Sequence, residues 1–393
     1  MLKRTQLIPL LFVQLLGTTD FMLVMPLGPS LAEGFGIPVE NTAWLSGAFA
    51  FCAALSGILL SKYLDRFARK PLLIGLLLAN ALLFFVSAML DSFGLWAVLR
   101  GLIGFVSTPI AALSMAIAMD MSEQDRPKAM AFMSLGFSLS AVIGVPLGLW
   151  IASFSHWQMV YWVEGLLACA LSLVLFFKLK HTSSAHRKTN NPLTLFKAWQ
   201  TPKLRQGLIL MCVSLFAAFL IIPHLAAILQ FNFNVPFAQL GSFYALGGLA
   251  TMALTLFTGK LLSNTNSLLL LMASSALSLI FLWVGFVFLW LAPVVIFVAF
   301  MSLNGSRNLI IQTHLSHLPK PQERAGYMAI LTTLRNVATA LAAFISSQIL
   351  VSNGEQPLSN VPLLVALGSV FIVITPLLLY LAHNNHKELP HEA

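Results

Sequence analysis

The stretch Ser61-Lys-Tyr-Leu-Asp-Arg-Phe-Ala-Arg-Lys-Pro71, with the uncharged run from Leu72 to Leu90 that follows it, contains the pattern that decides the fold. A short basic segment precedes a run of about 20 predominantly apolar residues, the length that a helix needs to cross a bilayer. The same alternation continues along the chain. Of the 393 residues, 58% are hydrophobic and 9% are charged, which is too little charge to cover a soluble domain. We therefore expect a multi-pass protein embedded in the lipid bilayer.

Twelve apolar runs are long enough to be transmembrane helices. Their predicted limits are 6–32, 42–63, 71–90, 95–119, 127–152, 158–178, 204–231, 238–261, 267–288, 290–313, 325–351 and 361–382. The ninth and tenth runs are almost continuous from Leu268 to Met301, but Pro293 favours two helices joined by a tight turn. The first run follows two basic residues, as in a signal peptide, but no small-residue cleavage pattern follows it. We expect an uncleaved first helix.

The distribution of charge predicts the orientation of these helices. The breaks on the side of the N-terminus carry the Lys and Arg residues, whereas the breaks on the other side carry acidic residues and no Lys or Arg. Those acidic residues are Glu33, Glu40, Asp91 and Glu355. The positive-inside rule therefore puts both termini in the cytoplasm. The net charge of +9 is dispersed over these loops, which favours attraction to the cytoplasmic leaflet over nucleic-acid binding.

The longest polar segment, residues 179–203, lies at the midpoint of the chain and is predicted to be a cytoplasmic linker. Its apolar end, Leu193–Trp199, suits a short interfacial helix. The linker separates an N-terminal six-helix bundle, residues 1–178, from a C-terminal bundle with a short tail, residues 204–393.

An internal repeat supports this division. The shift that places Pro38 on Pro236 also places Gln124-Asp125-Arg126 on Gln322-Glu323-Arg324. Two repeated halves of six helices are typical of secondary transporters, whose substrate site lies between the halves near the membrane midplane.

The basic break between the second and third runs resembles the signature G-x-L-a-D-R-x-G-R-K of the major facilitator superfamily. The matching residues are Asp65, Arg66, Arg69 and Lys70, and the small residues Ser61 and Ala68 replace the two glycines. The resemblance covers nearly the whole chain. It implies an all-α fold of twelve transmembrane helices in two pseudo-symmetric bundles. It also implies that the four charged residues form a cytoplasmic latch that helps to hold the outward-facing state.

Three further motifs resemble those of the drug- and sugar-exporting branch. Arg100-Gly-Leu-Ile-Gly104 is similar to the R-x-x-q-G signature of proton-coupled members, with Ile103 in place of Gln. Gly136 and the segment Gly144-Val-Pro146-Leu-Gly148 are similar to the Gly/Pro motif of antiporters. His156-Trp-Gln-Met-Val-Tyr161 is similar to the G-W-R-x-x-F that opens the sixth helix of this branch.

Asp20 and Arg100 are the leading candidates for proton coupling, with Glu164 as a further candidate. Asp20 falls near the middle of the first run and Arg100 inside the fourth. A charge inside lipid costs about 2.5–3.5 kcal/mol, so charges kept there usually have a function. Burial favours a protonated carboxyl group and a nearby cation favours an ionised one, so a proton can load and unload. The alternative for Asp20 is a structural ion pair, and Glu164 could instead line the substrate cavity or an interface.

Arg307 and Arg335 lie inside the tenth and eleventh runs, in a half that offers no intramembrane acid. They either pair with Asp20 or Glu164 across the halves, or bind a carboxylate or phosphate of the cargo through the guanidinium fork. Further candidate residues for cargo binding are Asn308, Asn336 and His224.

The sequence thus predicts a small-molecule exporter driven by proton antiport, and it favours an anionic cargo such as a carboxylate siderophore or metabolite. The alternatives are a proton-coupled importer or facilitator, and a ligand sensor that does not transport. We find no nucleotide-binding loop, no catalytic constellation and no metal-ligand spacing. We expect no enzymatic activity and no cofactor besides the proton gradient. The expected setting is a monomer in a bacterial inner membrane.

Overall fold

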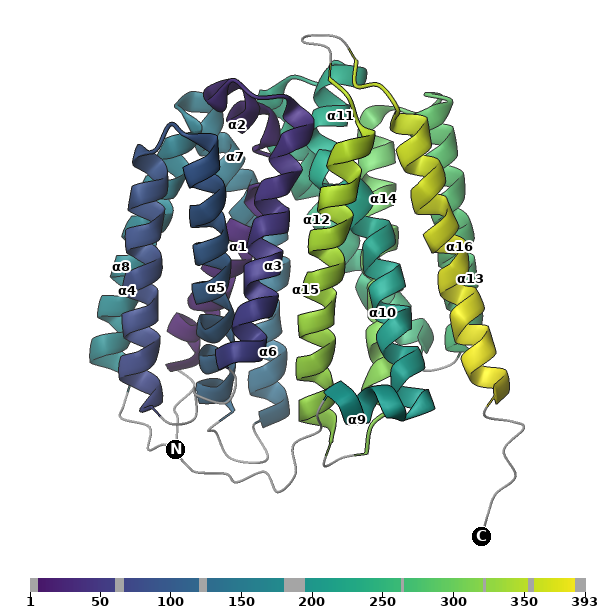
Figure 1. The fold of residues 1–393 in the computed structure, drawn as a ribbon, viewed down its shortest axis with the longest axis horizontal. Helices are drawn as coiled ribbons and strands as arrows, with labels where there is room; N and C mark the ends of the chain where they lie inside the picture. The colour runs from purple at the N-terminus through teal and green to yellow at the C-terminus, as the bar shows by residue number, and fades with distance from the viewer. Residues whose placement is uncertain are drawn as a thin grey trace. The chain divides into compact units, whose positions relative to one another are not determined.

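The computed structural model describes residues 6–60, 67–119, 126–179, 195–262, 265–320, 323–352 and 357–385. Within these ranges the chain is helical (Figure 1), apart from one isolated β-bridge between Val351 and Ser359. Eleven of the described helices are long and apolar enough to cross a membrane, and a bent helix pair raises the number to twelve if it is one span. The predicted all-α fold and its span count are confirmed.

The helical elements of the first six spans run from Leu7 to Lys178. They are α1 (Leu7–Leu23), α2 (Gly28–Phe35), η2 (Val39–Thr42), α3 (Ala43–Leu60), α4 (Arg69–Met89), α5 (Phe93–Ala118), α6 (Arg126–Leu139), η4 (Ser140–Gly144), α7 (Val145–Phe154) and α8 (Trp157–Lys178).

The helical elements of the last six spans follow a short connecting helix, α9 (Leu195–Gln200). They are α10 (Pro202–Ile221), η5 (Ile222–His224), α11 (Leu225–Asn232), α12 (Phe237–Leu262), α13 (Ser267–Leu282), η6 (Trp283–Val287), α14 (Pro293–Ser316), α15 (Arg324–Ile349) and α16 (Val361–Asn385). The sequence predicted a helix near α9, and Figure 1 shows α9 lying across the end of α10.

Contacts divide the chain into two compact units. The first comprises Met1–Lys188 and Pro223–Ala245, and the second comprises Thr189–Ile222 and Leu246–Ala393. In the first unit α3 packs on α5, α4 packs on α8 and α1 packs on α6. In the second unit α10 packs on α15 and α16, and α13 packs on α14. The segment 223–245 therefore belongs with the N-terminal helices by its contacts, although it follows the linker in sequence.

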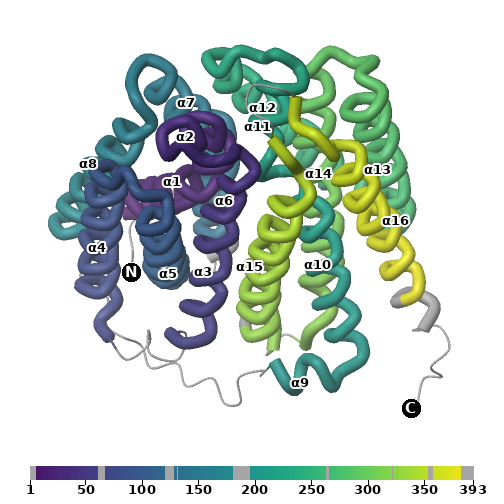
Figure 2. The backbone as a smooth tube through the Cα atoms, turned by 45° about the horizontal axis from the view of Figure 1, so that its top comes forward, coloured from purple at the N-terminus to yellow at the C-terminus, as the bar shows by residue number. Residues whose placement is uncertain are grey.

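The first span of each half is broken. α1 and α2 meet at an angle of 63°, a bend that is visible in Figure 2. Pro26 lies in this break and has no N–H to continue the helix. In the second half, η5 interrupts the span at Pro223 and His224, and the internal repeat aligns His224 with Pro26. Breaks of this kind occur in transporters, where discontinuous helices contribute to substrate and ion sites.

Prolines lie at several helix starts, and the sequence predicted the one at Pro293. Pro38 is the N-cap of η2, and its repeat partner Pro236 directly precedes α12. Pro293 is the first residue of α14, where a missing N–H has no cost. The tight turn before it contains Leu289 with a positive φ of 57°, so the predicted division of the ninth and tenth spans is confirmed.

Candidate functional site

The helix-five motif brings α1 close to the fifth span. Its small residues recur every four positions and lie along α1: Gly136, Ser140, Gly144 and Gly148. A Cβ atom added at Gly144 would overlap the Thr19 side chain, and one added at Gly148 would overlap Leu23. Small residues at such spacing let two helix backbones approach closely within a membrane. Asp20 is therefore held on a helix whose position depends on this motif.

Ser140 adds a hydrogen bond to the same interface. It begins the π-helical segment η4, and its Oγ atom lies 2.9 Å from the Leu15 carbonyl oxygen and 2.8 Å from the Gly136 carbonyl oxygen. The π segment ends directly before α7, whose start contains Pro146. A π-helical turn in a long helix is rare and is found frequently at functional sites.

A second close approach brings Phe49 to the helix of Arg100. A Cβ atom added at Gly104 of α5 would overlap the backbone of Phe49 on α3, and one added at Gly101 would contact the Cys52 sulfur. The Thr108 hydroxyl group donates to the Ala53 carbonyl oxygen at 3.2 Å. The glycine that ends the R-x-x-q-G-like motif thus serves the packing of α3 on α5.

Asp20 and Arg100 form a buried ion pair. The Arg100 Nη1 atom lies 2.5 Å from Asp20 Oδ1, and both side chains have an exposed fraction of 0%. Arg100 Nη2 also donates to the backbone carbonyl oxygen of Asp20 at 3.4 Å. Asp20 Oδ2 and Arg100 Nε have no hydrogen-bond partner among the described residues. The structure therefore brings the two predicted residues together and leaves each with unused hydrogen-bonding capacity.

Two aromatic rings lie against the guanidinium group of Arg100, and two more pack on one of them. Its Cζ atom lies 5.0 Å from the Phe49 ring centroid and 5.7 Å from the Trp96 ring centroid, which is within the range of cation–π attraction. Trp96 is fully buried, and its Nε1 donates to the Ser87 carbonyl oxygen at 2.9 Å. Its ring meets those of Trp157 and Tyr161 edge to face. We call Phe49, Trp96, Trp157 and Tyr161 the aromatic cage.

Glu164 lies beside this group on α8, one turn after Tyr161. It is 4% exposed, and neither carboxylate oxygen has a hydrogen-bond partner in the described parts of the chain. The charges of Asp20 and Arg100 both act on Glu164. Asp20, Arg100 and Glu164 thus form one electrostatically connected group, which we call the carboxyl–arginine cluster.

The second unit contains buried cationic charge of a different kind. Arg307 on α14 is 1% exposed, and within the described residues its Nε and Nη2 atoms have no hydrogen-bond partner. Arg335 lies on α15 and is partly buried. Glu323, at the N-cap of α15, is the one acidic residue among the described residues of this unit. The arginines therefore have no intramembrane carboxylate within their own unit, as far as that unit is described.

The remaining candidate cargo residues lie in different surroundings. Asn308 follows Arg307 on α14 and accepts a hydrogen bond from Gln312 at 3.2 Å. Asn336 follows Arg335 and is partly buried. His224 is buried at the end of η5, and it belongs to the first unit by its contacts. The structure therefore places His224 with the N-terminal helices and the other four candidates in the second unit.

Comparisons with known proteins agree with this fold. The sequence model of the Major Facilitator Superfamily matches residues 10–343. The chain belongs to the Major Facilitator Superfamily. A solved structure of the nucleoside transporter NupG has a TM-score of 0.75 at 14% identity, and covers 96% of this chain and 99% of that one. This match shows the shared fold. The superfamily comprises transporters rather than enzymes, which agrees with the sequence-based exclusion of catalysis.

Similar curated members of the superfamily include two bacterial proteins. The bicyclomycin resistance protein homolog of Haemophilus influenzae is 27% identical over 167 residues, which are 42% of this chain and 41% of that protein. A probable sugar efflux transporter of Pasteurella multocida is 27% identical over 186 residues, which are 46% and 45% of the two chains. The matched region thus spans less than half the length of each relative.

The superfamily motif after the second span is only partly described. Asp65 and Arg66 lie outside the described residues. Arg69 begins α4, and the Lys70 Nζ donates to the Phe176 carbonyl oxygen at 2.7 Å and lies 5.6 Å from that ring's centroid. Lys70 therefore connects the start of α4 to the end of α8 within the first unit.

Residues of the aromatic cage were not predicted from the sequence. Aromatic residues on α3, α5 and α8 are far apart in the chain, and a buried aromatic residue has the same hydropathy as one that faces lipid. The available signal was the motif resemblance at Trp157 and Tyr161, which lie one helical turn apart.

Proposed function

We propose that this chain is a secondary transporter that exports a small molecule from the bacterial cytoplasm in exchange for protons. The observation that carries the proposal is the carboxyl–arginine cluster, in which Asp20 is bonded to Arg100 and a second buried carboxyl group, Glu164, feels the charges of both. Sequence similarity to drug-resistance and sugar-efflux proteins supports export, and the bacterial relatives support a cytoplasmic-membrane location. The glycine motif of the fifth span supports antiport by its resemblance to that of exporters.

The cluster can couple a proton to a rearrangement of helices. With both carboxyl groups ionised it carries one net negative charge, and a single bound proton makes it neutral. A net charge away from water is costly, which favours binding of the proton whenever the cluster is accessible. A proton on Asp20 removes the charge that holds Arg100 to α1. Arg100 then remains close to Glu164 and to the aromatic faces on α3 and α5, so α1 is released.

We assign the main cargo-binding residues to the second unit. A buried guanidinium group that lacks a carboxylate partner in its own unit suits an anionic group of the cargo, because the guanidinium fork matches a carboxylate or phosphate. Arg307 is the leading residue, and Asn308 follows it on α14. Arg335 and Asn336, which are neighbours on α15, are further candidates. His224 at the break of the seventh span is a further candidate hydrogen-bonding group. We therefore favour a carboxylate-bearing cargo.

Proton movement on addition of cargo tests both parts of this proposal. Purified protein in proteoliposomes with a pH-sensitive dye is exposed to anionic, neutral and cationic candidate cargos. We expect an anionic cargo to cause proton release from the wild-type protein and none from Asp20→Asn. Arg307→Gln should release protons too, but only at a higher cargo concentration than wild type needs. Asp91→Asn is the matched control, since Asp91 is an exposed acid outside the spans.

The other outcomes lead to different functions. Proton uptake together with the cargo would indicate a symporter. Cargo movement without any proton movement would indicate a facilitator, and saturable binding without movement would indicate a sensor. Proton release with neutral or cationic compounds alone would retain antiport and exclude the anionic cargo.

A further inference from the structure

A cavity of about 510 Å³ lies in the second unit, separate from the residues assigned to coupling and cargo. It is formed by the first turns of α10, the end of α12, the start of α13, the last turns of α14 and one residue of α16. All of its lining residues belong to the second unit. The cavity is therefore a feature of that unit alone.

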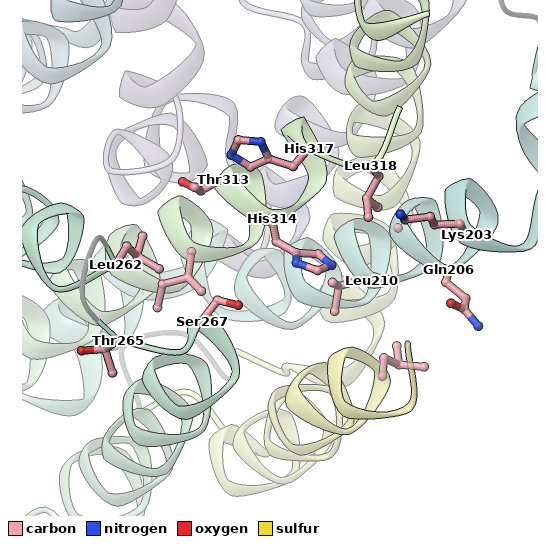
Figure 3. A pocket seen from close by; sticks show the side chains of 13 residues that line it. Lys203, Gln206, Leu210, Leu262, Thr265, Ser267, Thr313, His314, His317 and Leu318 are labelled. Carbon is pink, nitrogen blue, oxygen red and sulfur yellow. The ribbon is translucent and has the colours of Figure 1, made fainter. Parts of the chain in front are cut away.

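The lining of the cavity is amphipathic. Figure 3 shows the His314 ring between Leu210 and Ser267, with Lys203 on the neighbouring helix α10. The polar lining residues are Lys203, Gln206, Ser267, Thr313, His314 and His317. The apolar lining residues include Leu210, Leu262, Ile310 and Leu378. A ligand that fits this lining has a polar head that accepts hydrogen bonds and an apolar tail.

The helix that precedes α10 indicates where this end of the unit lies in a membrane. α9 buries Ala198, whereas Phe196 and Trp199 are 70% and 49% exposed. A short helix with exposed apolar and Trp side chains is suited to the membrane interface. Lys203 follows α9 closely in sequence, and its side chain is exposed. The mouth of the cavity is thus at the level of lipid headgroups, on the side that the basic loops predict to be cytoplasmic.

Charge at this end of the unit favours an anionic head. Lys203 and Lys260 lie near it, and Glu323, the acidic residue described in this unit, does not line the cavity. The last carbonyl groups of α14 disfavour an anion, but His314 in the last turn and His317 at the C-cap carry ring N–H donors. Ser267 begins α13, and its hydroxyl group can donate to a ligand, whereas the Leu268 N–H of the same turn already donates to the Asn266 side chain.

We propose that this cavity binds the phosphate headgroup of an anionic phospholipid of the cytoplasmic leaflet. Lys203 and His317 contact the phosphate at the mouth, Ser267 and His314 donate to it from within, and the start of an acyl chain lies along Leu210 and Leu378. The inference is independent of the proposed antiport.

Native mass spectrometry of protein from mixed vesicles tests the proposal. The probes are phosphatidylglycerol, phosphatidylcholine and inorganic phosphate. We expect wild type to retain phosphatidylglycerol in preference to phosphatidylcholine, and Lys203→Gln combined with His317→Gln to lower this retention about tenfold, the size expected for lost hydrogen bonds to a charged group. The matched control combines Arg205→Gln with His156→Gln. Arg205 is exposed on the same helix but does not line the cavity, and His156 is an exposed histidine of the other unit.

Three outcomes would overturn the proposal. Equal losses in the test and control variants would assign retention to general surface charge. Equal retention of the two lipids, with binding of inorganic phosphate that the test variant loses, would make the cavity a site for a free anion. Preference for phosphatidylcholine would exclude an anionic ligand.

Discussion

Arg100 and Arg307 are two fully buried arginines in two units of the same fold, and their surroundings differ. Arg100 is bonded to Asp20, lies against two aromatic faces and has Glu164 nearby. Arg307 lies in a unit whose one described acid is at a helix end, and two of its nitrogen atoms have no hydrogen-bond partner in the described residues. The first arginine is neutralised within its unit and the second is not. This difference is the basis on which we propose proton binding in one unit and binding of an anionic cargo in the other.

The largest effect is expected from Asp20→Asn. This change leaves Arg100 buried without its counter-charge, and breaking a buried ion pair on one side costs about 3–5 kcal/mol. We expect a large drop in the free energy of unfolding in detergent, together with loss of cargo-driven proton release. Asp20→Asn combined with Arg100→Gln should recover most of the stability and none of the proton release. An Asp20→Asn protein as stable as wild type would show that the Asp20–Arg100 ion pair does not stabilise the fold.

Arg307→Gln should weaken cargo binding without lowering the stability of the protein. Because no described carboxylate of its unit neutralises Arg307, removing the charge should leave thermal stability unchanged or raise it. Binding of an anionic cargo should weaken by about 1.5–3 kcal/mol, the usual value of hydrogen bonds to charged groups. Scintillation-proximity binding and thermal unfolding measure the two effects separately. A loss of stability as large as that of Arg100→Gln would mean that the two arginines are equivalent.

Gly104→Ala tests whether the arginine environment depends on the approach of α3 to α5. The added methyl group would overlap the Phe49 backbone, which cannot move as a flexible side chain can. Overpacking of this kind costs about 1–3 kcal/mol. Gly17→Ala on α1 is the control, because no atom lies near the added Cβ, and Ala is favoured over Gly in a helix by about 1 kcal/mol. Equal thermal stabilities for the two variants would contradict the close approach.

The smallest effect is expected from Phe49→Leu. Leu keeps most of the apolar volume but removes the aromatic face, so the loss should be about 0.5–2 kcal/mol, the range of a cation–π interaction. Phe51→Leu on the same helix is the control, since Phe51 is exposed and faces away from the cluster. Unfolding in detergent, followed by Trp fluorescence, measures both. If the two substitutions cost the same, the ring over Arg100 contributes only by its volume.

Features that follow from local composition were predictable. Apolar length predicted the spans, proline predicted the start of α14, and an intramembrane acid and an intramembrane base in the same half predicted the Asp20–Arg100 pair. The cage around Arg100 was not predictable, because hydropathy does not distinguish an aromatic residue that faces lipid from one that faces a cation. The π segment at Ser140–Gly144 and the cavity at His314 depend on how separate helices fit together. The roles proposed for Asp20, Glu164 and Arg307 remain predictions for the experiments above.

The contacts of residues 223–245 affect how the protein can be divided into two fragments. A cut after residue 178 would separate the first six spans from the last six, but the C-terminal fragment would carry α11, whose Leu225, Ala226 and Leu229 are completely buried. This segment packs on α2, which would be in the other fragment. We expect the C-terminal fragment alone to expose the apolar residues of α11 and to aggregate. The two fragments produced together should reassemble.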